Sequence, residues 1–335
     1  MGTKVLLTGG SGFVGGQLAK LLVARGHEVV ALVRRSSKVD ALKALGVRIA
    51  VADLNTGDGL NEAVEGVEVV QHVAGVTKAR SEEDYLRGNA ETTRMLASVL
   101  ARQKHPPRLV VCSSLAAAGP ARIGKPRTED ENPAPVSMYG RSKLAAEQAA
   151  REFSDRVPTV IVRPPIVYGP GDLTNLPPLM AMARTGVYLK AGRGPKHFSF
   201  VHVDDLDQAL LAAAERGKTL VPDNPTQGIY FASDPNPYSW EDFCAALSRA
   251  LGRGKPRVIS VPDFVGWATG AGAELGSRLL GTVSIMNRDK AKEMAQEAWT
   301  CSPARAVEEI GFRPEYPLDP GLENTVAWYR TQGMA

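Results

Sequence analysis

A glycine-rich turn between an apolar strand and an apolar-periodic helix constrains this chain more than any other feature. The turn is Thr8-Gly-Gly-Ser-Gly-Phe-Val-Gly15, and it joins the apolar residues 5–7 to the helical pattern of 17–22. Glycines 9, 12 and 15 permit a tight turn, close approach of a pyrophosphate, and close packing of helix on strand. The start of the helix offers unpaired N–H groups and a positive dipole end to phosphate. This context favours a dinucleotide-binding unit over a merely flexible glycine turn.

The end of the next strand-like segment, residues 28–33, indicates which dinucleotide is bound. Arg34 follows it, within Arg34-Arg-Ser-Ser-Lys38. An acid at this position serves the ribose hydroxyls of NAD, whereas a basic residue suits a 2′-phosphate. The planar guanidinium can make two bonds to a phosphate at once. The sequence therefore favours NADP(H), with NAD(H) or a merely solvated basic loop as the alternatives.

Tyr139 and Lys143 are candidate catalytic groups because they lie four residues apart in a helical segment, on one helix face. A free phenol titrates near pH ~10, which makes it a poor acid or base at neutral pH. A cation beside it favours the phenolate. The pair suits proton movement on a hydroxyl or carbonyl oxygen while hydride moves on the carbon. An exposed helix face is the alternative, since this spacing also occurs by chance.

Strand and helix signals alternate through the first half of the chain. Helical patterns such as 92–103 separate strand-like segments at 48–52, 68–73, 108–112 and 159–162. This alternation predicts an α/β fold, a Rossmann doubly wound parallel sheet with helices on both faces.

After Pro164 the alternation stops, and glycine and proline cluster up to Pro195. A strand-like segment at 197–203 leads into a helix that begins near Asp204. We expect residues 1–165, with 197–235 returning to them, to form the dinucleotide-binding domain. Residues 166–196 and 236–335 are then expected to form a smaller cap that binds the substrate.

Composition excludes several classes of protein. The chain has 335 residues, 44% hydrophobic and 23% charged, and its net charge of +4 gives no reason to expect a nucleic-acid partner. Cys112, Cys244 and Cys301 lie far apart, without the spacing of a metal site or a disulfide framework. The apolar stretch 258–286 is interrupted by charges and glycines, so no membrane span is expected. No signal segment opens the chain, which predicts a cytoplasmic location.

Taken together, these residues make the chain resemble the extended short-chain dehydrogenase/reductase family, the NAD-dependent epimerase/dehydratase group, over nearly its whole length. Besides the glycine loop, the matching segments are Asp53-Leu54, His72-Val-Ala-Gly75, Asn89, Ser113-Ser114, Tyr139 with Lys143, and Arg163-Pro-Pro-Ile-Val-Tyr-Gly-Pro-Gly171. Their order along the chain is that of the family.

The resemblance implies a role for each catalytic candidate. Tyr139 would be the general acid/base, and Lys143 would hold the nicotinamide ribose and depress the pKa of Tyr139. Ser114, rather than Ser113, would donate a hydrogen bond to the substrate oxygen, unless it is only a structural residue at a strand end. Asn89 would either be catalytic or only bond to the backbone of its helix.

The same resemblance implies the binding residues. Those expected at the cofactor are Gly9, Gly12, Phe13, Val14, Gly15, Arg34, Asp53, Leu54, Val73, Ala74, Gly75, Tyr139, Lys143, Pro164, Ile166 and Val167. Those expected at the substrate are Val76, Thr77, Ala116, Ile166, Tyr168 and part of 263–278. No metal site is expected.

The sequence departs from the family pattern in two places, and both departures bear on which reaction is expected. Val33-Arg34 stands where sugar epimerases that use NAD carry an acid, and the small apolar residues 115–119 follow the serine pair. Both features resemble the dihydroflavonol-reductase and 3β-hydroxysteroid-dehydrogenase branches. We expect an NADP(H)-dependent oxidoreductase that interconverts a ketone and a secondary alcohol on an apolar or polycyclic small molecule.

Two alternatives stay open. One is a nucleotide-sugar epimerase or dehydratase that retains its NAD(P), in which Arg184, Lys190, Arg193 and Lys196 could grip a diphosphate. The other is a non-catalytic cofactor sensor, which would have no need of Tyr139 and Lys143 together. Homodimers are common in the family, and the helix at 139–153 could supply the contact.

Overall fold

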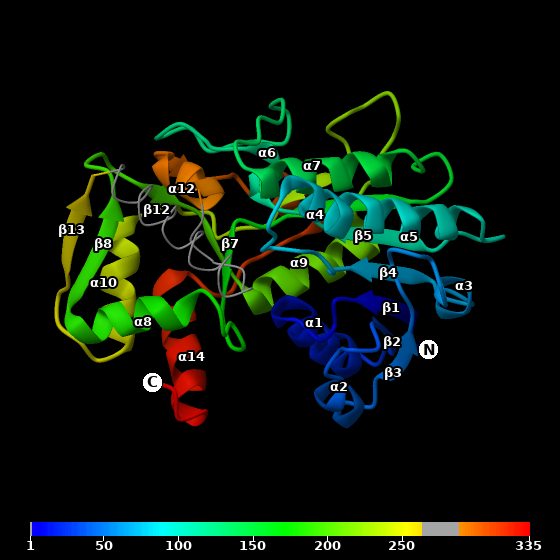
Figure 1. The fold of residues 1–335 in the computed structure, drawn as a ribbon, viewed down its shortest axis with the longest axis horizontal. Helices are drawn as coiled ribbons and strands as arrows, with labels where there is room; N and C mark the ends of the chain where they lie inside the picture. The colour runs from blue at the N-terminus through cyan, green and yellow to red at the C-terminus, as the bar shows by residue number, and fades with distance from the viewer. Residues whose placement is uncertain (1, 263–287) are drawn as a thin grey trace.

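The computed structural model describes residues 2–262 and 288–335. A large sheet with helices on both faces forms one lobe, and segments from the middle and the end of the chain form a smaller lobe beside it (Figure 1). The second lobe is called the cap below.

The large sheet has seven strands, all parallel, in the order β11-β6-β5-β4-β1-β2-β3. The strands are β1 (Lys4–Thr8), β2 (Glu28–Val33), β3 (Arg48–Val51), β4 (Val69–His72), β5 (Arg108–Cys112), β6 (Thr159–Arg163) and β11 (Ile229–Phe231). The direction of winding reverses between β1 and β4, so the loops after these two strands diverge and leave a crevice at their carboxyl ends. The predicted doubly wound sheet is confirmed.

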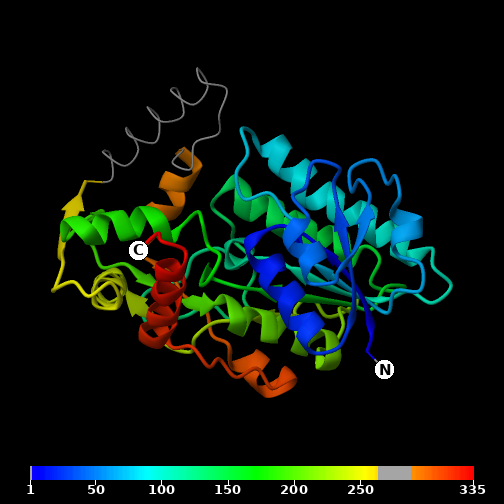
Figure 2. The same cartoon turned by 90° about the horizontal axis from the view of Figure 1, so that it is seen from below.

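Successive residues of each strand face opposite sides of the sheet, which gives two separate apolar cores. Val5 and Leu7 of β1 pack in one core, with α1 (Phe13–Ala24) and α9 (Val203–Arg216). Leu6 packs in the other, where α3 (Leu60–Ala63), α5 (Thr92–Ala101) and α7 (Met138–Arg151) contribute apolar side chains. Figure 2 shows helices on both sides of this sheet.

Short elements complete this lobe. They are α2 (Asp40–Ala44), α4 (Glu82–Leu86), a single π-helical turn at Arg87–Glu91 that runs into α5, α6 (Leu115–Ala118) and α13 (Ala304–Ile310). The α6 helix lies between β5 and α7 in sequence, and Ser114 is its N-cap.

The cap is built around a third apolar core. Its helices are α8 (Leu176–Thr185), α10 (Trp240–Ala250) and α14 (Leu318–Thr331), which bury Met180, Leu247 and Leu322 against one another. The parallel strands β8 (Val187–Ala191) and β13 (Arg257–Val261) lie at its outer edge. The short helix α12 (Arg288–Ala295) also belongs to this lobe.

Residues 197–203, expected to be one strand, form two. β9 (His197–Phe198) pairs with β12 (Tyr238–Ser239) and β14 (Ala298–Trp299), whereas β10 (Phe200–His202) pairs with β7 (Ile166–Tyr168). The break is at Ser199, whose N–H donates to the carbonyl of Trp299 at 2.8 Å. Val203 then begins α9 instead of ending the strand.

Most of the apolar stretch 258–286 lies outside the described residues. Within 2–262 and 288–335, the model contains no helix that is both long and apolar enough to cross a bilayer.

A buried ion pair fixes α7 against the sheet. Arg163, at the end of β6, donates to both carboxylate oxygens of Glu147, at 2.8 and 2.5 Å. The two side chains are only 2% and 5% exposed, and the guanidinium lies 5.7 Å from the centre of the Phe231 ring. The hydroxyl of Ser113 also donates to Glu147.

Replacing Glu147 should therefore destabilise the protein strongly, because it leaves the Arg163 charge buried and unpaired. We expect Glu147→Ala to lower the free energy of unfolding by about 3–5 kcal/mol, measured by urea denaturation. The matched control is Glu152→Ala, which breaks an ion pair to Arg94 whose side chains are 46% and 48% exposed. That loss should stay below about 1 kcal/mol; equal losses in the two variants would contradict the interpretation.

Candidate active site

Tyr139 lies in the first turn of α7, and Lys143 lies one turn further along. The helix begins after Ser137, whose hydroxyl accepts the N–H of Gly140 at 2.9 Å in the manner of an N-cap. Lys143 is 7% exposed, and its ammonium group donates to the carbonyl of Cys112 at 2.7 Å. The α7 helix thus presents the phenol and the ammonium next to the carboxyl end of β5.

The surroundings of Tyr139 favour its protonated form. Burial raises the pKa of its phenol well above the ordinary value, and the nearby Cys112, Glu293 and Tyr85 raise this pKa further. Ser114 has the opposite effect and lowers the pKa. Burial lowers the pKa of Lys143. The pKa of Tyr139 is therefore raised, whereas a neighbouring Lys143 alone was expected to lower it. Burial is the largest influence on this pKa and outweighs those that lower it.

The two serines after β5 face different partners. Ser114 caps α6, with its hydroxyl accepting the N–H of Ala116 at 3.1 Å, and its side chain lowers the pKa of the Tyr139 phenol. Ser113 is buried, and its hydroxyl donates to the Glu147 carboxylate. Of the pair, only Ser114 is therefore placed to share a substrate oxygen with Tyr139.

Asn89 sits in the π-helical turn Arg87–Glu91, a rare element that is frequent at functional sites. Its amide oxygen accepts the N–H of Val76 at 2.7 Å, and its amide nitrogen donates to the Val76 carbonyl at 3.0 Å and to Ser142 Oγ at 2.9 Å. Ser142 Oγ donates in turn to the carbonyl of Tyr139 at 2.8 Å. Both ends of the amide are engaged, so the geometry favours the structural alternative for Asn89.

His72 is a buried residue that bonds to Thr8 and Thr93. This structural role was not predicted from the sequence. Thr93 Oγ1 donates to the Asn89 carbonyl at 2.7 Å, so it accepts from His72 Nε2 at 3.0 Å. Thr8 Oγ1 accepts the N–H of Ala74 at 3.1 Å and donates to His72 Nδ1 at 2.8 Å. Burial, and then Lys143, lower the pKa of His72 to about 3. A neutral histidine in one tautomer thus joins the glycine loop to the Asn89 helix.

The glycine loop forms a cradle that a side chain would fill. Gly9 has a φ of +75°, and a Cβ there would lie 2.7 Å from the nitrogen of Ala74. A Cβ on Gly15 would overlap the carbonyl oxygen of Gly9. The N–H of Gly12 donates to the Gly9 carbonyl at 2.9 Å, and Phe13 begins α1. This backbone fits the pyrophosphate of a dinucleotide at the N-terminus of a helix.

Arg34 and Asp53 lie at the carboxyl ends of the neighbouring strands β2 and β3. Arg34 is exposed, and its N–H donates to Ser37 Oγ at 3.2 Å. Asp53 Oδ1 accepts the N–H and side-chain amide of Asn55 at 2.7 and 3.0 Å. These two bonds, and more weakly the charge of Arg34, lower the pKa of Asp53. Arg34 and Asp53 are therefore neighbours at the edge where the adenosine half would lie.

The remaining predicted cofactor residues follow strands at the same edge of the sheet. Val73, Ala74 and Gly75 follow β4, and Leu54 follows β3 in the same way. Pro164, Ile166 and Val167 come at the end of β6 and in β7; Pro164 is buried, and its carbonyl accepts the N–H of Leu115 at 2.8 Å.

The residues predicted to contact the substrate lie in different parts of the structure, unlike the predicted cofactor residues. Val76 and Thr77 follow β4, and Ala116 is buried in α6. Tyr168 lies in the cap core, where its ring is edge-on to Phe200 and His202. The expected lining at 263–278 lies outside the described residues.

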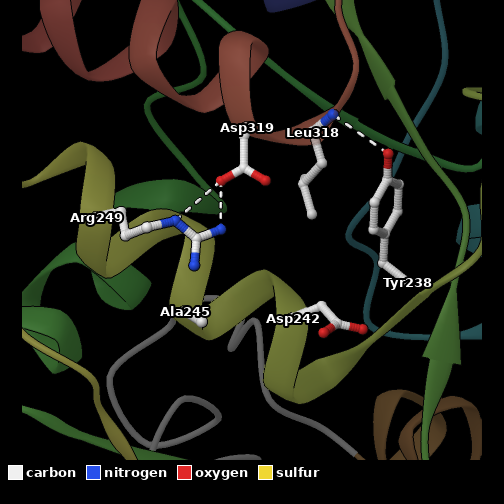
Figure 3. Close-up of a pocket in the computed structure, with 6 residues that line it drawn as sticks. All are labelled: Tyr238, Asp242, Ala245, Arg249, Leu318 and Asp319. Carbon is white, nitrogen blue, oxygen red and sulfur yellow. Dashed lines mark hydrogen bonds and ion pairs between the residues drawn. The ribbon is translucent and has the colours of Figure 1, made fainter.

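Within residues 2–262 and 288–335, the cysteines and the cavity between α10 and α14 do not offer a competing site. All three cysteines are free and buried, and the described residues contain no cluster of side chains suited to a metal ion. A cavity of about 180 Å³ opens between α10 and α14 (Figure 3), but its polar groups already contact one another, as in the Arg249–Asp319 ion pair and the Leu318 N–H bond to Tyr238. None of the predicted site residues lines it.

Comparison with known proteins agrees with this geometry. Residues 5–225 match the model of the NAD dependent epimerase/dehydratase family. A ceramide reductase of Caulobacter vibrioides is 32% identical over 98% of this chain and 95% of its own length. A crystal structure of gox2253 superposes with a TM-score of 0.79, at 26% identity and 98% coverage of both chains.

Other relatives carry out related reactions. The 4-hydroxy-2-methyl-3-oxo-4-farnesyl-3,4-dihydroquinoline-1-oxide ketoreductase of Stigmatella aurantiaca is 29% identical, over 96% of this chain and 95% of its own length. The UDP-glucose 4-epimerase of Vibrio cholerae is 26% identical, over 97% and 95%. The family model covers most of the chain, and the ceramide reductase exceeds 30% identity over nearly the whole of both proteins. The chain therefore belongs to the NAD-dependent epimerase/dehydratase group of the extended short-chain dehydrogenase/reductase family, and it is an NAD(P)-dependent enzyme that acts on CH–OH or keto groups.

Proposed function

We propose that this enzyme interconverts a ketone and a secondary alcohol with NADP(H), that Tyr139 moves the proton, and that the substrate is apolar. The observation that carries the mechanism is the place of Ser114 beside the phenol of Tyr139, where Ser114 lowers and burial raises the pKa of that phenol. Two hydroxyls held together at the carboxyl edge of the sheet can both reach one substrate oxygen.

In the reductive direction, Ser114 donates a hydrogen bond to the substrate carbonyl and polarises it. The nicotinamide, when bound, supplies the hydride to the carbonyl carbon. Tyr139 gives its proton to the oxygen as negative charge develops there, so the products are a secondary alcohol and a phenolate. Lys143, four residues along the helix, stabilises the phenolate electrostatically until solvent returns the proton.

The cations that a nucleotide-sugar enzyme would need are largely committed elsewhere. Lys190 pairs with Glu241 at 2.7 Å, and Arg184 donates to the carbonyl of Met334 at 2.9 Å. Lys196 donates to three carbonyls at the end of α12, at 2.7–3.0 Å. This favours an uncharged substrate over a diphosphate, in keeping with the small apolar α6 and with relatives named for a ceramide and a farnesylated quinoline.

The second candidate, a nucleotide-sugar epimerase or dehydratase, is favoured by the Vibrio cholerae relative. It would use the same Tyr139 and Ser114 but return the hydride to the substrate. The cytoplasmic location and the homodimer expected from the sequence stay predictions.

Removing the Tyr139 hydroxyl should abolish most of the activity. With a panel of alkyl, aryl and steroid ketones and NADPH, Tyr139→Phe should lower kcat/KM by about 10²–10⁴-fold, the usual contribution of a positioned acid. The Kd for NADPH should change little, because the other residues expected at the cofactor stay in place. Tyr188→Phe is the control: it removes a tyrosine hydroxyl in the cap core, which bonds with Ser248 Oγ at 3.3 Å, and should leave kcat/KM unchanged. Activity of Tyr139→Phe close to that of the wild type would refute the mechanism.

The cofactor preference should depend on Arg34. Fluorescence titration should give a lower Kd for NADPH than for NADH, and Arg34→Ala should weaken NADPH binding by about 10–100-fold, as expected for a lost hydrogen bond between charged groups. NADH binding should hardly change. The control is Arg48→Ala, an exposed arginine at the opposite end of the sheet. Tighter binding of NADH by the wild type would contradict the assignment.

Substrate class separates the two candidate reactions. Incubation of the purified protein with UDP-sugars and dTDP-sugars, followed by NMR without added cofactor, should show no conversion. Apolar ketones in the panel should instead oxidise NADPH stoichiometrically. Conversion of a sugar nucleotide without added cofactor would establish the epimerase or dehydratase candidate.

A further inference from the structure

The first turn of α7, which carries Tyr139, is held by a side chain 150 residues further along the chain. Asp289 of α12 accepts the N–H of Met138 with both carboxylate oxygens at 2.9 Å, and Oδ2 lies 3.4 Å from the N–H of Tyr139. Asp289 is only 5% exposed. One turn further along α12, Glu293 Oε1 accepts the hydroxyl of Ser137 at 2.6 Å. Figure 1 shows α12 beside this end of α7.

These contacts complete the start of the helix. The first N–H groups of a helix have no partner within it. Ser137 accepts the N–H of Gly140, and its carbonyl accepts the N–H of Arg141, which leaves the two amides of Met138 and Tyr139. Asp289 takes both, and its negative charge is favourable at the positive end of the helix dipole. The orientation of the catalytic turn thus depends on a carboxylate from the cap.

The α12 helix is itself firmly held. Lys196 donates to the carbonyls of Met294, Ala295 and Gln296 at its C-terminal end, where a cation is favoured by the dipole. The indole N–H of Trp299 donates to the Glu293 carbonyl at 2.8 Å. Because these contacts fix the C-terminal end of α12, the helix holds Asp289, in its first turn, against the start of α7.

We propose that Asp289 is a positioning residue of the reaction: by binding the first turn of α7 it sets the place of Tyr139, with Glu293 tuning the charge around the phenol. This inference rests on the proposed function, because it presumes that Tyr139 moves the proton. It makes α12 the physical link between the substrate-binding cap and proton transfer.

The groups that face Tyr139 define the sign of the charge effect. They are Cys112 from β5, Ser114 at the start of α6, Tyr85 from α4, and Glu293 with Asp289 from α12. The carboxylate of Glu293 opposes a phenolate and so raises the pKa of Tyr139. Removing that charge should lower the pKa. Since reduction needs the protonated phenol, the alkaline fall of the rate should then begin at lower pH.

The positional part is tested with Asp289→Ala and Asp289→Asn. Asp289→Ala should increase deuterium uptake in the peptide that contains the amides of Met138 and Tyr139, and should lower kcat by about 10–100-fold, the scale of a displacement near 1 Å. The Kd for NADPH should stay within about two-fold. Asp289→Asn keeps one acceptor oxygen and should recover most of both the amide protection and kcat.

The electrostatic part is tested with Glu293→Gln, which retains an oxygen for Ser137 and removes the charge. The alkaline limb of kcat for ketone reduction should move to lower pH. Glu297→Gln is the matched control: it makes the same change four residues along, at an exposed site, and should leave the limb in place. An equal shift in the two variants would show only a general surface-charge effect and would overturn this part.

The outcomes separate this inference from the proposed function. Unchanged deuterium uptake in Asp289→Ala, or increased uptake with unchanged kcat, overturns the positioning role while Tyr139→Phe stays inactive. An active Tyr139→Phe overturns the proposed function itself, whatever the amides do. A parallel fall of kcat in Asp289→Ala and Asp289→Asn, with equal loss of thermal stability, would mark Asp289 as merely structural.

Discussion

The buried ion pair of Glu147 and Arg163 is the interaction on which the site depends. It joins the middle of α7 to the end of β6, and Ser113 attaches the end of β5 to the same carboxylate. Desolvating two charges is costly, so such a pair adds little net stability. Its value here is geometric: a bidentate contact fixes both the rotation and the height of α7 against the sheet. Lys143, one turn before Glu147, then reaches the Cys112 carbonyl.

A hydrogen-bonded network extends this order from α7 toward the glycine loop. Ser142 and Asn89 bind α7 to the loop after β4, while His72 joins Thr93 of α5 to Thr8 at the end of β1. The hydroxyls of Thr8, Thr93 and Ser142 each donate one hydrogen bond and accept another. The donor and the acceptor of every bond in the network are therefore fixed. Buried polar groups are tolerated only when satisfied in this way. The cofactor loop and the proton donor are consequently parts of one rigid edge, which suits a reaction that transfers hydride and proton at adjacent atoms.

The sequence was sufficient to predict those features whose residues lie close together along the chain. The strand, glycine turn and helix follow one another directly, so the fold class could be inferred, and the four-residue spacing of Tyr139 and Lys143 placed them on one face. Contacts between distant segments carried no such signal. Asp289 lies 151 residues from Met138, and no residue near Asp289 in the sequence indicates that its partner is a backbone amide. The break at Ser199 likewise depends on Trp299, a hundred residues later. Burial caused the remaining difference, because the raised pKa of Tyr139 reflects water excluded by the whole fold rather than the charge of one neighbour.

The division between the lobes explains how one constellation can serve both reductases and epimerases. The groups to which we assign proton transfer are fixed by the sheet and α7, which follow the family pattern closely. We assign the choice of substrate to the cap, where Lys190, Lys196 and Arg184 contact other residues of the cap. A cation that already binds a carboxylate or several carbonyls would have to give up those bonds to bind a diphosphate. The cost is about 1.5–3 kcal/mol for each hydrogen bond of the buried Lys196, and below about 1 kcal/mol for an exposed contact such as the Lys190–Glu241 pair. An apolar substrate requires no such exchange, so in this chain the chemistry of the cap argues for a ketone carried on a hydrophobic body.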